Sequence, residues 1–217
     1  MKKIISFSLW GNDKKYLIGA LENIKLQKQL FPKWTCRFYV HNEVPKEYKI
    51  KLMETEGCEV VQKTGDLGSH MDKPGMFWRF EVLKDKDVER FIARDVDSRL
   101  SLRDRSCVLD WIASKKEFHI IRDHAMHGTR IMGGMWGATQ NFINRINYDE
   151  LIDKFSKLEY KNMYATDQEF LGRMIYPLLF AYDVCIHDNF DRFKEDARKI
   201  PHISMNGEYI GMPVEVE

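Results

Sequence analysis

Short apolar runs alternate with amphipathic stretches along most of this chain, and this alternation restricts the fold more than any other feature. Runs that are typical of buried strands lie at 3–10, 35–41, 59–62, 88–94, 118–122, 133–138 and 181–187. Patterns that predict helices lie at 14–30, 45–56, 74–83, 103–114, 140–146, 148–155 and 166–176. Because strands that alternate with helices form helix-covered parallel sheets, we predict an α/β fold with a mainly parallel, Rossmann-like sheet.

Length, charge and hydropathy exclude several classes of protein. The 217 residues, 44% of them hydrophobic, suffice for one core, so we predict a single domain over 1–217. The 34 basic and 33 acidic residues nearly cancel, which gives no electrostatic basis for binding nucleic acid. No stretch of about 20 apolar residues predicts a transmembrane segment, and the N-terminus lacks the long apolar region of a signal peptide. We therefore expect a soluble, cytoplasmic protein, either complete or part of a longer polypeptide with further domains.

The four cysteines show no metal-binding pattern. Cys36, Cys58, Cys107 and Cys185 are scattered, no two of them form a CxxC pair, and their spacing matches no zinc motif. Scattered thiols in a chain of this size are typical of a reducing compartment, so we expect buried or incidental free thiols.

Two aspartates follow the strand predicted at 88–94, within the stretch FIARDVDSRLS. Ligands of open α/β sheets bind beyond the carboxyl ends of the strands, and side chains two residues apart in an extended segment point the same way. Asp95 and Asp97 can therefore converge on one Mn²⁺ or Mg²⁺ ion, which prefers carboxylate and phosphate oxygens as ligands. Since two carboxylates alone make a weak site, we expect a diphosphate to complete it.

Other interpretations of this DxD pair stay open, because acidic residues also cap helices or simply face water. A calcium loop of the EF-hand type is excluded, since its glycine and glutamate positions hold Leu100 and Ser106. Phosphatases of the haloacid-dehalogenase type also place DxD after a strand, but Arg99 stands where they usually have Thr or Val. A metal-dependent phosphatase or nucleotidyltransferase, and a non-catalytic nucleotide- or glycan-binding domain, are the alternatives.

Four blocks in a fixed order carry a resemblance to a known family. They are FIARDVDSRLS (91–101), HIIRDH (119–124), IMGGMWGA (131–138) and TDQEFL (166–171). In this order they resemble small glycosyltransferases of the GT-A fold, from bacterial surface-polysaccharide clusters and large algal viruses. The resemblance implies a GT-A fold, a nucleotide-sugar donor such as a UDP-sugar, and Mn²⁺ or Mg²⁺ on the DxD pair. It also implies transfer to a hydroxyl of a glycan or glycoconjugate acceptor, in the host cytoplasm if the chain is viral.

The resemblance suggests where the donor would bind. GT-A proteins hold the base and ribose at the end of the first strand, where this chain has Ser8, Leu9, Trp10 and Gly11. Similar proteins also carry an arginine before the DxD strand, and Arg79 could clamp a diphosphate in the same way. Lys73 is a less specific candidate, and Arg94 could hold a carboxylate in place. A buried tryptophan, a turn glycine and a surface arginine are the structural alternatives.

The segment IMGGMWG combines glycines with a tryptophan. Gly133 and Gly134 would let the backbone approach a ligand closely, and Trp136 could offer an apolar face to a sugar ring. The alternative is a bulged strand with a core tryptophan. The resemblance favours a wall of the donor-sugar or acceptor site.

TDQE at 166–169 reads as a helix start with a capping box, in which Thr166 and Glu169 cap each other. This leaves Asp167 unexplained, and a carboxylate in the first turn of a helix should stay ionised. We therefore predict Asp167 as the catalytic base and Asp123 as the second candidate. Gln168 could touch the donor sugar, as in the DQ motif of some retaining GT-A enzymes. An ionised base suits inversion, so the stereochemical outcome stays open.

A histidine near the C-terminus often joins the metal ligands of GT-A enzymes. His187 and His202 are the candidates, and a polar strand end is the alternative for each. The sugar, the acceptor and the linkage cannot be predicted from these residues.

Overall fold

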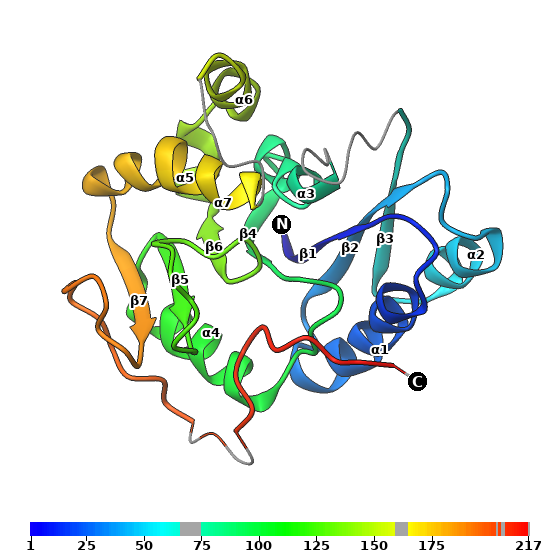
Figure 1. Cartoon of the computed structure of the whole chain (residues 1–217), viewed down its shortest axis with the longest axis horizontal. Helices are drawn as coiled ribbons and strands as arrows, with labels where there is room; N and C mark the ends of the chain where they lie inside the picture. The colour runs from blue at the N-terminus through cyan, green and yellow to red at the C-terminus, as the bar shows by residue number, and fades with distance from the viewer. Residues whose placement is uncertain (66–74, 159–164, 203, 205–206, 217) are drawn as a thin grey trace.

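The computed structural model describes residues 1–65, 75–158, 165–202, 204 and 207–216 (Figure 1). Within these residues the strands are β1 (Lys2–Leu9), β2 (Thr35–His41), β3 (Cys58–Lys63), β4 (Val88–Ala93), β5 (Phe118–Arg122), β6 (Trp136–Thr139) and β7 (Val184–Asp188). The α-helices are α1 (Lys14–Leu30), α2 (Lys46–Glu54), α3 (Gly75–Trp78), α4 (Leu102–Ser114), α5 (Gln140–Arg145), α6 (Tyr148–Ser156) and α7 (Thr166–Phe170). The predicted α/β class is therefore confirmed.

The strands form one sheet in the order β3-β2-β1-β4-β6-β5-β7. Every neighbouring pair is parallel except those of β6, which is antiparallel to both β4 and β5. The chain builds outward from β1 through β2 to β3 and then returns to place β4 on the other side of β1. This reversal makes a topological switch point at the carboxyl ends of β1 and β4, where open α/β sheets bind ligands.

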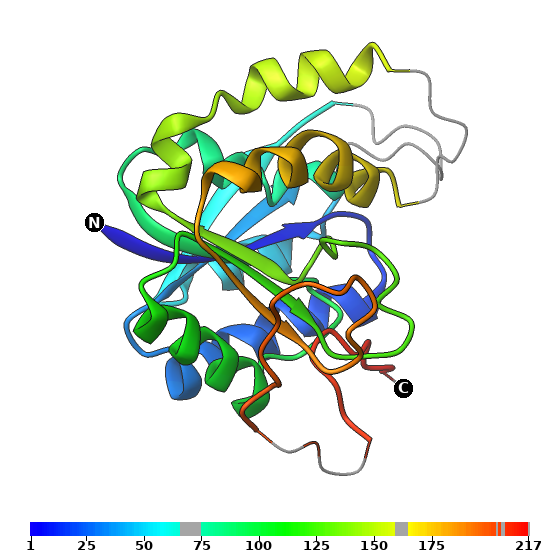
Figure 2. The same ribbon diagram turned by 90° about the vertical axis from the view of Figure 1, so that its left-hand side faces the viewer.

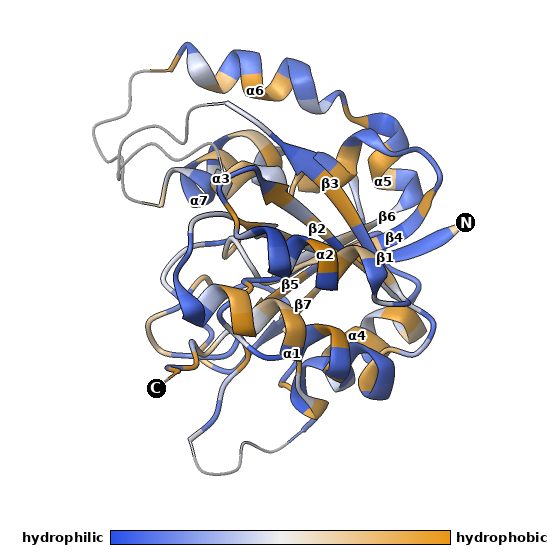
Figure 3. Ribbon diagram, turned by 90° about the vertical axis from the view of Figure 1, so that its right-hand side faces the viewer, coloured by the Kyte–Doolittle hydropathy of each residue, from blue (hydrophilic) through white to orange (hydrophobic). Residues whose placement is uncertain are grey.

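Helices cover both faces of the sheet and enclose a hydrophobic core on each side (Figure 2). On one face, α1 and α4 pack Leu17, Ile24 and Trp111 against the inner strands. On the other face, Phe80, Phe142 and Phe170 pack against the strands from the segments around α3, α5 and α7. Figure 3 shows apolar and polar residues alternating along α1 and α4, as expected for helices with one buried side.

Several predicted boundaries needed correction. The extended segment predicted at 133–138 becomes a strand only from Trp136, because Met132–Met135 form a hydrogen-bonded turn (Met135 N to Met132 O, 3.1 Å). The helix predicted at 166–176 is α-helical only to Phe170 and continues as π and 3₁₀ turns to Ala181. Pro177, near the start of the 3₁₀ turn, is not compatible with a regular α-helix that runs through this segment. Part of the helix predicted at 74–83 lies outside the described residues, and the rest is α3 followed by a 3₁₀ turn. In the described part of the chain, no helix has the length and apolarity to cross a membrane.

Candidate active site

Asp95 and Asp97 follow β4, from which Arg94 separates them, and lie at the switch point between β1 and β4. We predicted that they lie in an extended segment, but they lie in a turn. The Ser98 amide donates to the Asp95 carbonyl (3.3 Å), and the Ser98 hydroxyl donates to the same oxygen (2.8 Å). The turn, and not strand alternation, therefore brings the two carboxylates near each other.

Helix α1 holds this turn in place through two residues that the sequence did not single out. The buried Asn23 side chain donates to the carbonyls of Val96 (3.3 Å) and Ser98 (2.8 Å) and accepts from the Leu100 amide (3.0 Å). One turn earlier, a Cβ on Gly19 would lie 2.1 Å from the Val96 carbonyl oxygen, so only glycine permits this close approach. The one feature of the sequence that could have indicated Asn23 and Gly19 is that a polar and a small residue stand on the apolar side of the predicted helix.

Arg79 joins the DxD pair to Asp167. Its Nη1 donates to Asp95 Oδ1 and its Nη2 to Asp167 Oδ2, each at 2.6 Å. Asp167 is 2% exposed and Arg79 is 7% exposed, so this ion pair is almost fully removed from water, whereas the Asp95 side chain stays partly exposed. The guanidinium that was predicted to clamp a diphosphate is thus engaged by two protein carboxylates.

Two polar atoms of this cluster have no hydrogen-bond partner among the described residues. They are Asp167 Oδ1 and Arg79 Nε, both buried. A buried acceptor without a donor costs free energy, and such atoms are common where a ligand supplies the missing group. Asp167 Oδ1 is therefore available to a hydroxyl or amide of a bound molecule.

The electrostatics of the site reflect a crowding of negative charge. Burial and the neighbouring Asp95 raise the pKa of Asp97 above its ordinary value of 3.8. Burial raises the pKa of Asp167 as well, against the opposing effect of Arg79. Asp95 keeps a more open position, with 37% of its side chain exposed, and Asp97 keeps 19%. A cation between these two partly exposed carboxylates would relieve their mutual repulsion.

A second cation, Lys15 of α1, lies beside Asp97. Its Nζ is 3.4 Å from Asp97 Oδ2 and 3.9 Å from Glu215 Oε1. The C-terminal segment runs along the same turn, because the Val214 amide donates to the Asp97 carbonyl (2.9 Å) and Ser98 bridges to Pro213. Lys15 was not among the predicted site residues, since one lysine in a basic helix start carries no distinctive signal.

The two glycines of GGMWG contact protein carboxylates. A Cβ on Gly133 would lie 2.3 Å from Asp167 Oδ2, and one on Gly134 would lie 2.0 Å from Asp95 Oδ2. The glycines therefore let this backbone pass between the two acidic side chains of the site. Trp136 does not face the site: it is fully buried and packs against Phe80, Phe91 and Phe118. The core-tryptophan alternative was correct for this residue.

The end of β1 lies against Arg79 and leaves two residues partly open. Ser8 Oγ accepts from the Arg79 amide (2.9 Å), and Leu9 is buried, so the Ser8 side chain and Leu9 serve the scaffold. Trp10 and Gly11 are partly exposed, and Gly11 has φ of 73°. Of the four candidates, Trp10 and Gly11 are the residues left partly accessible to a nucleotide.

Several other predicted residues lie elsewhere. Asp123 is buried and takes a hydrogen bond from Arg103 Nε (2.6 Å) and another from the Ile210 amide (2.9 Å). This ion pair accounts for Asp123 structurally, and among the described residues no hydrogen bond or ion pair joins Asp123 to the DxD turn. Arg94 does hold a carboxylate, but that of Asp104 (3.0 and 2.7 Å) and not one of the DxD pair.

His187 is also engaged away from the aspartates. Its Nδ1 lies 3.0 Å from His119 Nε2 and its Nε2 lies 3.1 Å from Asp110 Oδ2, so neither ring nitrogen is open to a metal on the DxD pair. Lys73 lies outside the described residues. The carbonyl of His202 accepts from Arg103.

The start of α7 differs from the predicted capping box. Ala165, with φ of 57°, occupies the N-cap position without a side-chain cap, Thr166 is inside the helix, and Glu169 pairs with Arg173 (2.8 Å). Gln168 is partly exposed beside this cluster, and its Oε1 accepts from the Thr129 hydroxyl (2.8 Å). Asp167 is thus held at the first turn of α7 by Arg79 and not by capping.

Comparisons with known proteins show the fold. No family model and no curated protein matches the chain. Among solved structures, a glycosyltransferase involved in glycosylation of the major capsid of PBCV-1 has a TM-score of 0.54 at 12% identity, covering 87% of this chain and 82% of that chain. A Bacillus anthracis protein described as a glucose-1-phosphate thymidylyltransferase has a TM-score of 0.51 at 10% identity, covering 87% and 86%.

The glycosyltransferase GlyE of Streptococcus pneumoniae TIGR4 has a TM-score of 0.52 at 14% identity, and the match covers 85% of this chain but only 44% of GlyE. At these identities the likeness concerns the fold alone. The chain therefore has the GT-A fold, which glycosyltransferases share with nucleotidyltransferases.

Proposed function

We propose that this GT-A-fold chain is a metal-dependent glycosyltransferase that moves a sugar from a UDP-sugar to a hydroxyl of a glycan or glycoconjugate. The observation that carries the proposal is the Asp95–Arg79–Asp167 cluster beside Asp97, at the switch point of the sheet. It combines a partly exposed carboxylate pair with a buried carboxylate that has one oxygen without a hydrogen-bond partner among the described residues. A metal-bound diphosphate and a sugar hydroxyl are ligands that fit these two features.

The carboxylates of Asp95 and Asp97 fit a hard divalent cation. They offer only oxygen ligands, they are partly exposed, and burial together with their mutual repulsion raises the pKa of Asp97. Mn²⁺ or Mg²⁺ bound there would neutralise the negative charge that develops on the departing diphosphate. Arg79 and the Gly134 backbone hold Asp95 in a fixed orientation, and α1 holds the turn that carries Asp97.

The donor's nucleotide fits at the end of β1. Trp10 offers an aromatic ring there and Gly11 an uncovered backbone, both partly exposed. The Trp10 ring is supported from behind by Gly75, where a Cβ would lie 2.6 Å from the ring, and by Trp78 at 6.2 Å between ring centroids. A uracil ring could stack on such a supported aromatic surface.

Asp167 fits the role of a hydroxyl-binding group that also takes a proton. Its Oδ1 would accept a hydrogen bond from a sugar hydroxyl, and the same oxygen can receive the proton when that hydroxyl attacks. Burial raises the pKa of Asp167, which makes the carboxylate a stronger base than an exposed aspartate. Arg79 keeps the carboxylate oriented. We assign contact with the donor sugar to the neighbouring, partly exposed Gln168.

The proposal is tested by calorimetric titration of UDP into the protein with Mn²⁺ and with a chelator. We expect binding that requires Mn²⁺ and that is lost in Asp97→Asn. Asp153→Asn, a change of an exposed aspartate in α6, is the matched control and should bind like the unmodified protein. No binding of UDP in the presence of Mn²⁺ would refute the choice of UDP.

Turnover separates this function from its alternatives. With UDP-sugars as donors, release of UDP supports glycosyl transfer, whereas release of a sugar 1-phosphate or inorganic phosphate supports a nucleotidyltransferase or phosphatase. Metal-dependent binding without turnover, unaltered by Asp167→Asn, would support a binding domain. We include a nucleotidyltransferase among the alternatives because that class of enzyme shares this fold.

A further inference from the structure

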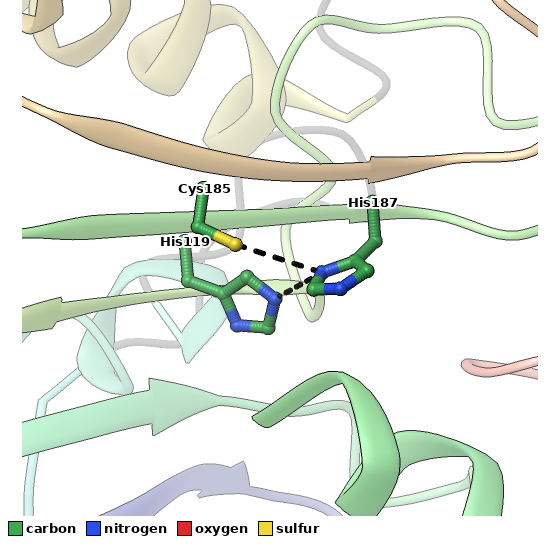
Figure 4. A group of neighbouring side chains, drawn as sticks. All are labelled: His119, Cys185 and His187. Carbon is green, nitrogen blue, oxygen red and sulfur yellow. Dashed lines mark hydrogen bonds between the residues drawn. The ribbon is translucent and has the colours of Figure 1, made fainter. Parts of the chain in front are cut away.

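Three side chains with metal-binding atoms converge on one face of the sheet, away from the aspartates (Figure 4). His119 lies on β5 and Cys185 and His187 on β7, and all three are fully buried. The parallel register pairs His119 with Cys185, and His187 is two residues further along the same strand. Strand alternation therefore directs the three side chains to the same face, which α4 covers.

The distances are close to those of a coordinated ion. His119 Nε2 lies 3.0 Å and Cys185 Sγ 4.0 Å from His187 Nδ1, and the three ligand atoms lie within 4.8 Å of one another. Since nitrogen and sulfur ligands lie about 2.0–2.3 Å from a metal ion, their mutual separation around an ion is about 3.5 Å. Shifts of about 1 Å or less would bring these atoms to that separation.

The surroundings prepare the histidines as ligands. His187 Nε2 lies 3.1 Å from Asp110 Oδ2, and Arg198 also contacts that carboxylate oxygen at 2.7 Å. An ionised carboxylate can only accept a hydrogen bond, so His187 Nε2–H donates to Asp110 and His187 Nδ1 keeps a lone pair that faces the other two side chains. A carboxylate on the far nitrogen of a ligating histidine is the usual arrangement in metal sites. The Trp111 ring stacks on His119 with centroids 5.0 Å apart.

Protonation and charge decide which ion fits. A histidine binds a metal ion as a neutral imidazole, and a cysteine binds it as a thiolate. A thiolate and two neutral imidazoles carry one negative charge. A monovalent ion gives a neutral assembly, whereas Zn²⁺ would leave a net positive charge in a fully buried place. Zn²⁺ also requires a fourth ligand, and the described residues place no further His, Cys or acidic ligand in this cluster.

We propose that His119, Cys185 and His187 form a buried three-ligand site for Cu⁺, which links the edge strand β7 to β5. On binding, the Cys185 thiol releases its proton to solvent, and the proton on His119 Nε2 moves to Nδ1. Copper keeps its oxidation state throughout. His119 Nδ1 has no hydrogen-bond partner among the described residues, and its burial costs free energy with and without the ion. The site is independent of the proposed glycosyl transfer.

The test is a titration of reduced, metal-stripped protein with Cu⁺ in competition with a chromophoric Cu⁺ chelator. We expect one Cu⁺ per chain by native mass spectrometry and a rise in the melting temperature. Cys185→Ser should weaken binding by more than about 100-fold, since loss of a ligand exceeds the 10–100-fold cost of losing an outer partner. Cys107→Ser is the matched control, because Cys107 is equally buried, and it should bind Cu⁺ like the unmodified protein.

Three results would overturn the proposal. One is no binding in competition with the chelator. Another is equal binding by Cys185→Ser, which would place the ion on another thiol such as the partly buried Cys58. The third is tighter binding of Zn²⁺ than of Cu⁺ at the same ligands. Circular dichroism of Cys185→Ser distinguishes a lost ligand from a lost fold, and His187→Gln provides a second ligand variant if the serine variant does not fold.

Discussion

Gly134 gives the sharpest test of how the site is built, because its missing side chain makes room for Asp95. A Cβ at this position would lie 2.0 Å from Asp95 Oδ2, 2.5 Å from Cγ and 2.8 Å from the backbone nitrogen. Real Cβ contacts essentially never fall below 3.0 Å, so Gly134→Ala forces the Asp95 carboxylate or its backbone to move by about 1 Å. That movement also disturbs the 2.6 Å ion pair between Asp95 and Arg79.

The expected cost has two parts. Overpacking of this kind lowers the free energy of unfolding by about 1–3 kcal/mol. A misplacement of about 1 Å in a reacting group lowers a catalytic rate by on the order of 100-fold. Chemical denaturation measures the first effect, and UDP release from a UDP-sugar measures the second, with the Mn²⁺-dependent affinity for UDP followed by calorimetry.

Gly172→Ala is the matched control, since no atom lies within 4 Å of the Cβ it would add. It should change the free energy of unfolding by no more than about 0.5 kcal/mol and leave the rate unchanged. If Gly134→Ala had the stability and the UDP affinity of the unmodified protein, the inference that Gly134 positions Asp95 would be refuted.

Three further predictions concern the neighbours of this contact. Asn23→Ala removes three hydrogen bonds from the DxD turn, so chemical denaturation should show a free energy of unfolding lower by about 2–3 kcal/mol. The same change should weaken Mn²⁺-dependent UDP binding. Asn141→Ala, at an exposed position, is the control and should change neither quantity. Because burial raises the folded-state pKa of Asp167, protonation of Asp167 favours the folded state. Its contribution to stability is therefore present below pH 3.8 and is lost as pH rises through the folded pKa. The difference in free energy of unfolding between Asp167→Asn and the unmodified protein should change in that pH window, and a constant difference would contradict the shift. Lys15→Met removes the cation 3.4 Å from Asp97 and should tighten binding of Mn²⁺ alone, as measured by calorimetry; unchanged or weaker binding would show that Lys15 does not compete with the metal.

Part of the fold could be predicted because it depends on neighbours in the sequence. The short apolar runs at 35–41 and 118–122 became β2 and β5 with the same bounds, and the helical spacing at 14–30 became α1. The placement of Asp95 and Asp97 at a strand end was also correct, since it needs only the end of one apolar run. The direction of β6 was not predictable, because it depends on which strands it joins.

Local sequence patterns could not predict which residues of the site contact one another. Arg79 and Asp167 are 88 residues apart in sequence, and His119 and His187 are 68 apart, so no spacing rule connects either pair. From the sequence we expected the glycines of GGMWG to let the backbone approach a ligand, because the glycines indicate a close contact but not its partner. In the structure the backbone approaches the carboxylates of Asp95 and Asp167.

The sequence by itself determined the α/β class, most strand and helix positions, and the acidic pair at the end of β4, because these follow from short-range hydrophobic periodicity and chain geometry. Only the tertiary structure decided that Arg79 joins Asp95 to Asp167, that Asn23 and Gly19 hold the DxD turn, and that Trp136 belongs to the core. These contacts arise where the order of strands in the sheet brings distant segments together, and that order is set by the packing of the whole chain.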